Sequence, residues 1–285
     1  MTTIADVLEQ LPVTELDLQR FVSVPVAATA AETIEAMNRD GVSCAFIVDD
    51  GILAGIFTQR DVLLGVLGHV GACMKPVTEL MTSTLRTMAE TQSVADGLHI
   101  MNDLWVRSVP VMNDDNQIVG NLSYYPLMRL IADLLGEKAL RTPNEVSVQH
   151  GMQFIDFTGL NYSLPITVEA TNTVADAIYQ MQSRAIGSLF VVDDREHLVG
   201  VLTEYDLQNK VACKAHDEEA LLVRDVMTPE PIALSVRSPI GDAMSEMADH
   251  GFSHVPLLGE SGRLVGVTSF RDIAEYFETS LGVLS

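Results

Sequence analysis

The sequence predicts an α/β protein made of four β-α-β-β-α repeats that pair into two pseudo-two-fold modules. Three observations lead to this fold class. A short glycine-initiated element occurs four times, the spacing between its copies alternates, and each copy follows the same succession of helical and strand patterns. A chain of 285 residues is long enough to build two cores of ordinary size.

The recurring element has Gly first, then two residues that are usually apolar, then Ser or Thr, and in three copies Asp at the seventh position. We call it the closing element, because it leads into the last helix of each repeat. Its glycines lie 65, 80 and 66 residues apart, so the first and third copies are separated by 145 residues and the second and fourth by 146. The larger unit is therefore a pair of repeats that occurs twice. The four copies are Gly55–Asp61, Gly120–Pro126, Gly200–Asp206 and Gly266–Asp272.

Helical and strand patterns precede the closing elements. Apolar residues recur at helical spacing in the second, third and fourth repeats, as expected of helices with one buried face. Short apolar runs at 45–48, 109–112, 189–192 and 255–258 predict strands that are covered on both sides. Turn-forming Asp, Asn or Gly residues follow each run. The helical positions are Val94, Leu98 and Met101; Val174, Ala177, Ile178 and Met181; and Ile240, Ala243, Met244 and Met247.

The repeats divide the chain into two domains joined by a linker. The segment between the pairs loses the apolar periodicity and contains Pro143-Asn144, which is typical of a boundary. The predicted boundaries are 1–136 for the first pair (repeats at about 22–70 and 77–136), 137–150 for the linker, and 151–285 for the second pair (repeats at about 151–213 and 224–280).

The charge balance excludes some classes of partner. The chain carries 39 acidic and 17 basic residues, for a net charge of −22. Nucleic acid is not an expected partner of such an acidic protein, because phosphate backbones are bound by clustered cations. No apolar stretch approaches the length needed to cross a bilayer, so we expect no membrane insertion.

The location of the protein is predicted from its amino terminus and its cysteines. The first 18 residues lack the basic start and apolar run of a secretory signal. Cys44, Cys73 and Cys213 are widely separated and form no CxxC motif. These features predict reduced thiols in a cytoplasmic protein.

The repeat pattern resembles the CBS (cystathionine-beta-synthase) domain family over roughly residues 22–280. The resemblance is carried by the four closing elements in register and by the strand starts Val109-Pro110-Val111 and Val255-Pro256-Leu257. At the proline position the first and third repeats instead have Phe46 and Phe190. The resemblance implies that two repeats pack through their sheets into a module with two clefts. Such clefts commonly bind adenosine compounds, namely AMP, ADP, ATP, S-adenosylmethionine or, less often, NAD.

The closing element has two interpretations. Ser/Thr-x-x-Asp is a capping box, in which the hydroxyl and the carboxylate satisfy backbone N–H groups at a helix start. The same geometry leaves N–H groups that suit an anion, while the family uses the Asp to hold the two hydroxyls of a ribose. The resemblance implies contacts of three kinds. The ribose would be held by Asp61, Asp206 and Asp272, and the hydroxyl groups that donate to phosphate would be those of Thr58, Thr203 and Ser269. Adenine would lie against the strands near Ala45, Leu189 and Val255.

Two arginines and one proline distinguish the four copies. Arg60 and Arg271 immediately precede their Asp residues, where a guanidinium could turn toward a phosphate or could simply face solvent. Pro126 replaces the Asp of the second copy. Because proline is tolerated in the first turn of a helix, we expect the helix to persist with Ser123 as its cap. The ribose clamp is lost there, so the chain should bind at most three adenosine ligands in this way.

The sequence favours a regulatory protein over an enzyme. It contains none of the common nucleophile, zinc-protease or nucleotide-loop motifs, and the repeats take up nearly the whole chain. His250 and His254 have no third ligand nearby, so no metal site is expected. The predicted function is a sensor that needs no cofactor, binds an adenine nucleotide or S-adenosylmethionine, and modulates an unknown partner protein; family habits allow a homodimer. The alternatives are a scaffold that binds nothing, and a small nucleotide hydrolase, which would show turnover without a partner.

Overall fold

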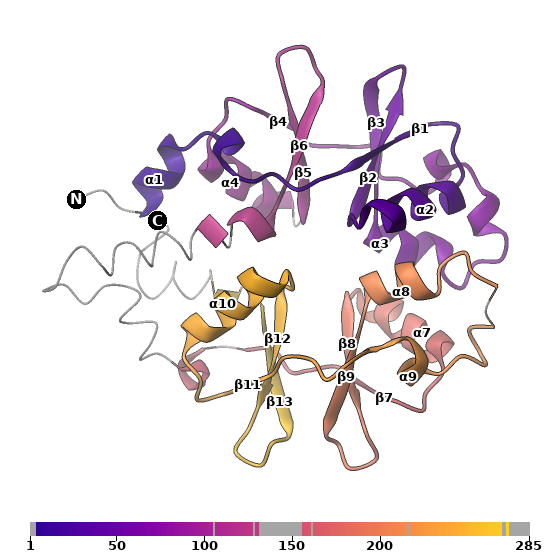
Figure 1. Ribbon diagram of the computed structural model, residues 1–285, viewed down its shortest axis with the longest axis vertical. Coiled ribbons are helices and arrows are strands. Elements are labelled where there is room, and N and C mark those ends of the chain that lie inside the picture. The colour runs from indigo at the N-terminus through magenta and orange to yellow at the C-terminus, as the bar shows by residue number, and fades with distance from the viewer. Residues whose placement is uncertain are drawn as a thin grey trace, which may run out of the picture.

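The computed structural model describes residues 4–104, 106–127, 129–130, 156–160, 162–215, 217–269 and 272–273. Four small sheets form two side-by-side pairs, and the two pairs lie one above the other with helices between them (Figure 1). The predicted α/β class with four repeats in two modules is confirmed. The predicted linker at 137–150 lies outside the described residues.

The strands are β1 (Val22–Pro25), β2 (Cys44–Asp49), β3 (Ile52–Thr58), β4 (Met88–Ala89), β5 (Ser108–Met112), β6 (Ile118–Ser123), β7 (Thr167–Glu169), β8 (Ser188–Val192), β9 (Leu198–Thr203), β10 (Thr228–Pro229), β11 (Leu234–Ser235), β12 (His254–Leu258) and β13 (Leu264–Ser269). The helices are α1 (Ile4–Gln10), α2 (Ala30–Asp40), α3 (Gln59–Asp61), α4 (Val94–Leu104), α7 (Val174–Arg184), α8 (Glu204–Lys210), α9 (Val223–Val226) and α10 (Ile240–His250). A π-helical segment, Val62–Val66, continues α3.

Each repeat has the same sheet topology. Its first strand pairs in parallel with the second, and the second forms an antiparallel hairpin with the third, as in β1-β2-β3 and β4-β5-β6. The helix between the first two strands makes the crossover that a parallel pair requires. In the third repeat β10 adds a fourth strand beside β9. Strand, helix, strand, strand and helix therefore follow one another as predicted.

The predicted duplication of a pair is confirmed by contacts between segments far apart in the sequence. Four backbone bridges in the first module recur in the second, shifted by 144 to 146 residues. The corresponding bridges are Pro12–Ser93 and Asp156–Pro239, Gln19–Asn121 and Ser163–Val267, Thr29–Pro76 and Thr173–Leu222, and Ile56–Thr82 and Val201–Thr228.

Within the first module the two sheets pack face to face. Phe46 and Ile56 are buried between them, together with Cys44. The Asn121 side chain, on the sheet of the second repeat, donates to Cys44 Sγ at 3.4 Å. Burial raises the pKa of the Cys44 thiol to about 12, so this cysteine stays protonated at neutral pH.

The glycine that begins each closing element is required by close packing. A Cβ atom on Gly55 or Gly200 would overlap the sulfur of Met81 or Met227, respectively. The other two glycines are covered by Leu18 and Tyr162 in the same way. Each covering residue lies next to a residue that forms an antiparallel bridge with the strand of the closing element. These segments therefore both connect the sheets and cover them.

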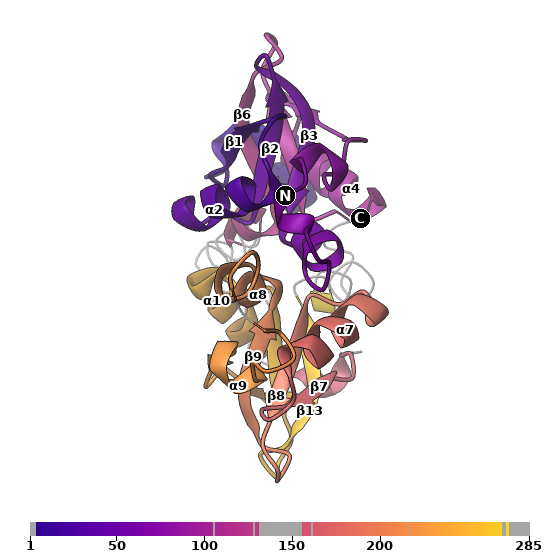
Figure 2. The same cartoon turned by 90° about the vertical axis from the view of Figure 1, so that its right-hand side faces the viewer.

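Helices join the two modules. The helices of the first repeat lie against those of the third, and the helices of the second lie toward those of the fourth (Figures 1 and 2). One hydrophobic core contains buried residues of repeats one and three, and a second core contains residues of repeats two and four. Amide groups add polar contacts: Gln208 Nε2 donates to Asn38 Oδ1 at 2.7 Å, and Gln182 Nε2 donates to the Leu63 carbonyl at 2.7 Å.

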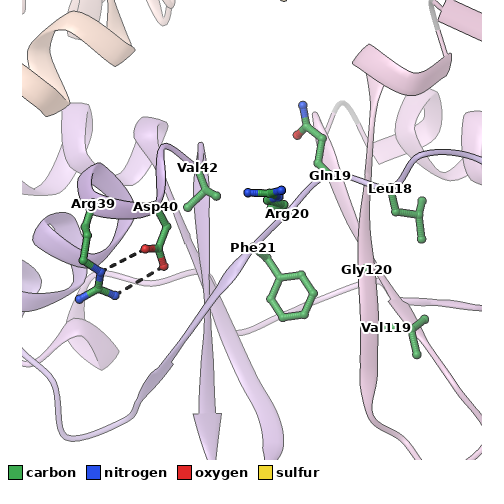
Figure 3. Close-up of a pocket in the computed structure, with 9 residues that line it drawn as sticks. All are labelled: Leu18, Gln19, Arg20, Phe21, Arg39, Asp40, Val42, Val119 and Gly120. Atoms are coloured by element: carbon green, nitrogen blue, oxygen red, sulfur yellow. Dashed lines mark hydrogen bonds and ion pairs between the residues drawn. The ribbon is translucent and has the colours of Figure 1, made fainter.

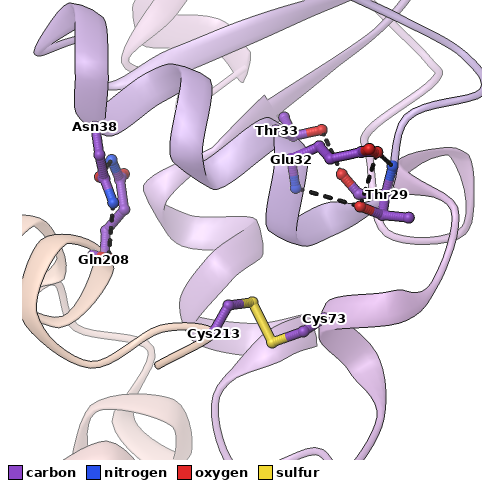
Figure 4. Close-up of a disulfide and its surroundings, with 7 residues drawn as sticks. All are labelled: Thr29, Glu32, Thr33, Asn38, Cys73, Gln208 and Cys213. Atoms are coloured by element: carbon purple, nitrogen blue, oxygen red, sulfur yellow. Dashed lines mark hydrogen bonds between the residues drawn. A yellow bond between two sulfur atoms is a disulfide. The ribbon is translucent and has the colours of Figure 1, made fainter. Parts of the chain in front are cut away.

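A disulfide also joins the modules. Cys73 and Cys213 are bonded across a sequence separation of 140 residues, beside the Asn38–Gln208 pair (Figure 4). The prediction of reduced thiols is therefore wrong for these two residues. Sequence spacing could not reveal the bond, because it depends on how the modules stack. None of the described helices is long and apolar enough to cross a membrane.

Replacing Cys73 with Ser should lower the free energy of unfolding by roughly 2 to 5 kcal/mol, because a cross-link over a long loop restricts the unfolded chain. Urea denaturation of the oxidised protein measures this loss. Cys213→Ser should give the same loss, and reductant should destabilise the wild type but neither variant. An unchanged midpoint on reduction of the wild type would contradict the bond.

Ala185→Gly should stabilise the protein by about 0.5 to 1 kcal/mol. Ala185 ends α7 in the left-handed region at φ 54°, where α2 and α10 have Gly41 and Gly251. Glycine adopts this conformation without the steric cost that a side chain brings. Thermal unfolding measures the change, and Gly41→Ala is the reverse control, which should lower the melting temperature.

Candidate functional site

The closing elements form the capping boxes that their sequence predicts. In the first, Thr58 N and Thr58 Oγ1 both donate to Asp61 Oδ2 at 2.7 Å, and Asp61 N donates back to Thr58 Oγ1 at 3.4 Å. The third and fourth elements repeat these bonds with Thr203–Asp206 and Ser269–Asp272. In all three, the cap uses one carboxylate oxygen and leaves Oδ1 as the only oxygen for another contact.

The surroundings of Oδ1 differ among the three aspartates. Asp206 is 2% exposed, and its Oδ1 already accepts from Lys210 Nζ and Thr228 Oγ1, each at 2.8 Å. Burial raises the pKa of Asp61, and hydrogen bonds from Thr58 and Thr82 oppose that rise. For Asp272, the described residues provide no hydrogen-bond partner to Oδ1. Asp272 is therefore the aspartate most open to a ligand.

The residues expected beside adenine have their side chains in the protein core. Ala45, Leu189 and Val255 are all 0% exposed and belong to the two inter-module cores. Their side chains cannot line a cleft, so any adenine contact from these strands would fall to the backbone. Their role in binding stays a prediction.

A cleft of about 660 Å³ opens in the first module, between the segment before β1, the end of α2, and β6 (Figure 3). Arg20 and Phe21 line it together with the Arg39–Asp40 ion pair. None of the residues proposed from the sequence lines it. Sequence reasoning missed this cleft because its walls come from segments far apart in the sequence, and of its lining residues only Gly120 belongs to a closing element. The lining residues are Leu18, Gln19, Arg20, Phe21, Arg39, Asp40, Val42, Val119 and Gly120.

The strand that forms one wall of this cleft ends in the degenerate closing element. Residues 124–127 after β6 are helical and Pro126 is buried, so the helix persists as predicted. Ser123 Oγ accepts from Tyr125 N at 3.3 Å. The Pro126 position offers no carboxylate, so the second closing element has no aspartate that could hold a ribose.

Arg60 is engaged in an ion pair between modules. Its Nε lies 2.7 Å from Oε1 of Glu204, whose side chain is only 4% exposed. Arg107 Nη1 donates to Glu204 Oε2 at 3.1 Å. Neither expected role of Arg60, facing phosphate or facing solvent, describes this arrangement. Arg271, the other arginine proposed for phosphate, lies outside the described residues.

The two histidines considered as metal ligands have other contacts. His250 pairs with Glu246 on its own helix at 3.4 Å, and His254 Nδ1 lies 2.9 Å from Ser253 Oγ. Among the described residues, no group of three or more His, Cys, Asp or Glu side chains could hold a metal ion.

Known proteins share this fold. The crystal structure of a Methanocaldococcus jannaschii protein, proposed to be an archaeal homologue of g-AMPK, has a TM-score of 0.76 at 16% identity and covers 94% of this chain and 100% of that chain. An uncharacterised Pyrococcus horikoshii protein has a TM-score of 0.56 at 16% identity and covers 93% of this chain and 99% of that one. At these identities the similarity concerns the fold alone.

Curated sequence relatives cover parts of the chain. An uncharacterised protein of Methanopyrus kandleri is 28% identical over 110 residues, which are 39% of this chain and 56% of that protein. An inosine-5'-monophosphate dehydrogenase of Methanocaldococcus jannaschii is 32% identical over 108 residues, 38% of this chain and 21% of the enzyme. The chain spans 42% to 63% of the length of the other two curated relatives that we compared, from Acidianus ambivalens and Schizosaccharomyces pombe.

The family is established by direct matches along the sequence. The model of the CBS domain matches four segments, 13–68, 77–133, 164–212 and 223–279. These segments coincide with the four sheets and together span well over half of the chain. The chain therefore belongs to the CBS domain family and contains four CBS repeats in tandem.

Proposed function

We propose that this protein is a regulatory sensor that binds adenosine-containing ligands in the clefts of its CBS modules and so modulates a partner protein. The observation that carries the proposal is the closing element at Ser269–Asp272. Its carboxylate is fixed by a cap through Oδ2, while Oδ1 has no partner among the described residues. A fixed oxygen with free acceptor capacity suits the hydroxyl groups of a ribose.

The ligands proposed are AMP, ADP, ATP or S-adenosylmethionine, bound as regulators and not as cofactors of a reaction. Membership of the CBS family and the use of the chain for paired repeats support a regulatory role. The proposed target is a partner protein, and a homodimer is one permitted assembly. Occupancy would be read by the partner through the stacking of the modules, because α3 and α8, which begin within the first and third closing elements, lie in the helix layer between the modules (Figure 1).

A scaffold that binds no ligand is the second candidate. Two observations favour it: Asp206 is saturated by Lys210 and Thr228, and Pro126 has replaced the aspartate of the second repeat. A scaffold would keep the fold and the caps without needing an open oxygen on Asp272. Ligand binding by the purified protein separates the two candidates.

Asp272→Asn should weaken binding of the best adenosine ligand at least tenfold, because a charge-assisted hydrogen bond contributes about 1.5 to 3 kcal/mol. Titration calorimetry with AMP, ATP and S-adenosylmethionine measures the change. Asp96→Asn is the matched control. Ser93 and Asp96 form the same capping box at the start of α4, in an exposed position and outside the sequence of the closing elements. The control should lose a similar small amount of stability and keep full affinity. If none of the three ligands raises the melting temperature of the wild type, the scaffold is correct.

The wild type should bind at most three adenosine ligands, and Pro126→Ala should leave the number bound unchanged. The second closing element has no carboxylate to remove, so only its helix start is altered. Calorimetric stoichiometry tests both statements. Four equivalent sites in the wild type would show that the aspartate is dispensable for binding.

A further inference from the structure

A buried carboxylate lies where the repeats meet. Glu204 is the first residue of α8 in the third repeat, and its side chain is 4% exposed. Arg60 reaches it from the first repeat, with Nε 2.7 Å from Oε1 although not aligned as a hydrogen bond. Arg107 reaches it from the second repeat and donates to Oε2 at 3.1 Å. One carboxylate therefore holds guanidinium groups from two other repeats.

The carboxylate is held in a closely packed setting. Glu204 N donates to the Gly187 carbonyl at 3.0 Å. A Cβ atom on Gly187 would lie 3.1 Å from both Glu204 Oε2 and Arg107 Nη2. The Glu204–Arg107 ion pair therefore packs against the backbone of Gly187. Removing a carboxylate from water is costly, and the two guanidinium groups offset that cost. Such an arrangement persists only when the anion has its cations close by.

Carboxylate and phosphate are recognised by the same feature of arginine. The planar guanidinium offers a fork of N–H donors that matches two oxygens of either group. Arg60 immediately precedes Asp61, so it is the nearest cation in sequence to a ribose held by that aspartate. A phosphate on such a ribose would need the donors that Glu204 already occupies.

Among the described residues, no positive charge is left over in this cluster. Arg60 is electrostatically coupled to Arg107 and also to the carboxylates of Glu204 and Asp61. Burial, and then the charge of Arg107, lowers the pKa of His254 to about 4, so this imidazole is neutral at pH 7. The two guanidinium charges face two carboxylates, and an added phosphate would meet the negative charge of Glu204 at short range.

We propose that Glu204 is a built-in anion that excludes phosphate from the Arg60–Arg107 pair, so that a site on the closing element of the first repeat takes an adenosine compound without phosphate. A nucleoside or a sulfonium compound such as S-adenosylmethionine fits this description. The inference rests on the proposed function in one respect, namely that Asp61 holds a ribose. It assigns to Glu204, a residue outside the closing-element pattern, the choice of ligand class.

The test compares adenosine with AMP in an Asp272→Asn background, where the open clamp of the fourth repeat is disabled. Calorimetry should show adenosine binding at least tenfold more tightly than AMP. Adding Glu204→Gln, which keeps the size of the side chain and removes its charge, should erase or reverse that ratio. Glu219→Gln, which neutralises an exposed carboxylate, should leave the ratio unchanged.

Inorganic phosphate provides a probe that does not depend on adenosine. It should raise the melting temperature of Glu204→Gln, but not that of the wild type or of the double variant Glu204→Gln with Arg60→Gln. Equal affinity of the Asp272→Asn protein for AMP and adenosine would overturn the proposal. This measurement does not need Glu204→Gln to fold. Absence of a phosphate response in a folded Glu204→Gln protein would overturn it too. If phosphate stabilises this variant while no form of the protein binds adenosine, the anion site stands and the proposed function is wrong.

Discussion

The whole architecture depends on one constraint: each repeat has a small sheet with two apolar faces and helices for only one of them. On β2 of the first repeat, Ala45 and Ile47 join the core that contains the helices, while Cys44 and Phe46 point to the opposite face. This alternation follows from the two-residue period of a strand. The second face can be buried only against another repeat, so the pair is the smallest unit that hides both faces.

Stacking of the modules buries a different apolar surface, namely the faces of the helices that point away from their own sheets. Apolar residues of repeats one and three merge into one core, and amide contacts and a disulfide lie at its edge (Figure 4). Several polar groups at this layer make hydrogen bonds from one module to the other, as most buried polar groups do. Glu204 is the extreme case, since its charge is compensated only when the modules are stacked. The charged contacts therefore depend on the stacking that the apolar contacts provide.

The local structure and the pairing of the repeats could be predicted from the sequence, but the individual contacts between the modules could not. The closing elements, their caps and the helical faces depend on residues a few positions apart, so their spacing identifies them. The Cys73–Cys213 bond and the Arg60–Glu204 pair join different modules, and no local pattern specifies which residues meet. The Asp206 carboxylate illustrates the same limit. Its cap could be predicted from Thr203, but Thr228 reaches it from a separate connection after the helix. Ala45, Leu189 and Val255 were placed beside a ligand by resemblance, and alternation along the strand turns their side chains into the core.

The connections that cover the closing-element glycines determine how such a chain can be rearranged in evolution. Leu18 belongs to the first repeat yet covers Gly120 of the second, and Met81 belongs to the second repeat yet covers Gly55 of the first. A gene segment encoding one repeat would thus produce a sheet whose glycine lacks the side chain that packs over it. A cut between paired repeats would place each covering residue on a different fragment from the glycine that it covers. These repeats therefore keep their covering residues only when they are duplicated as whole pairs. The same holds when they are transferred to another protein.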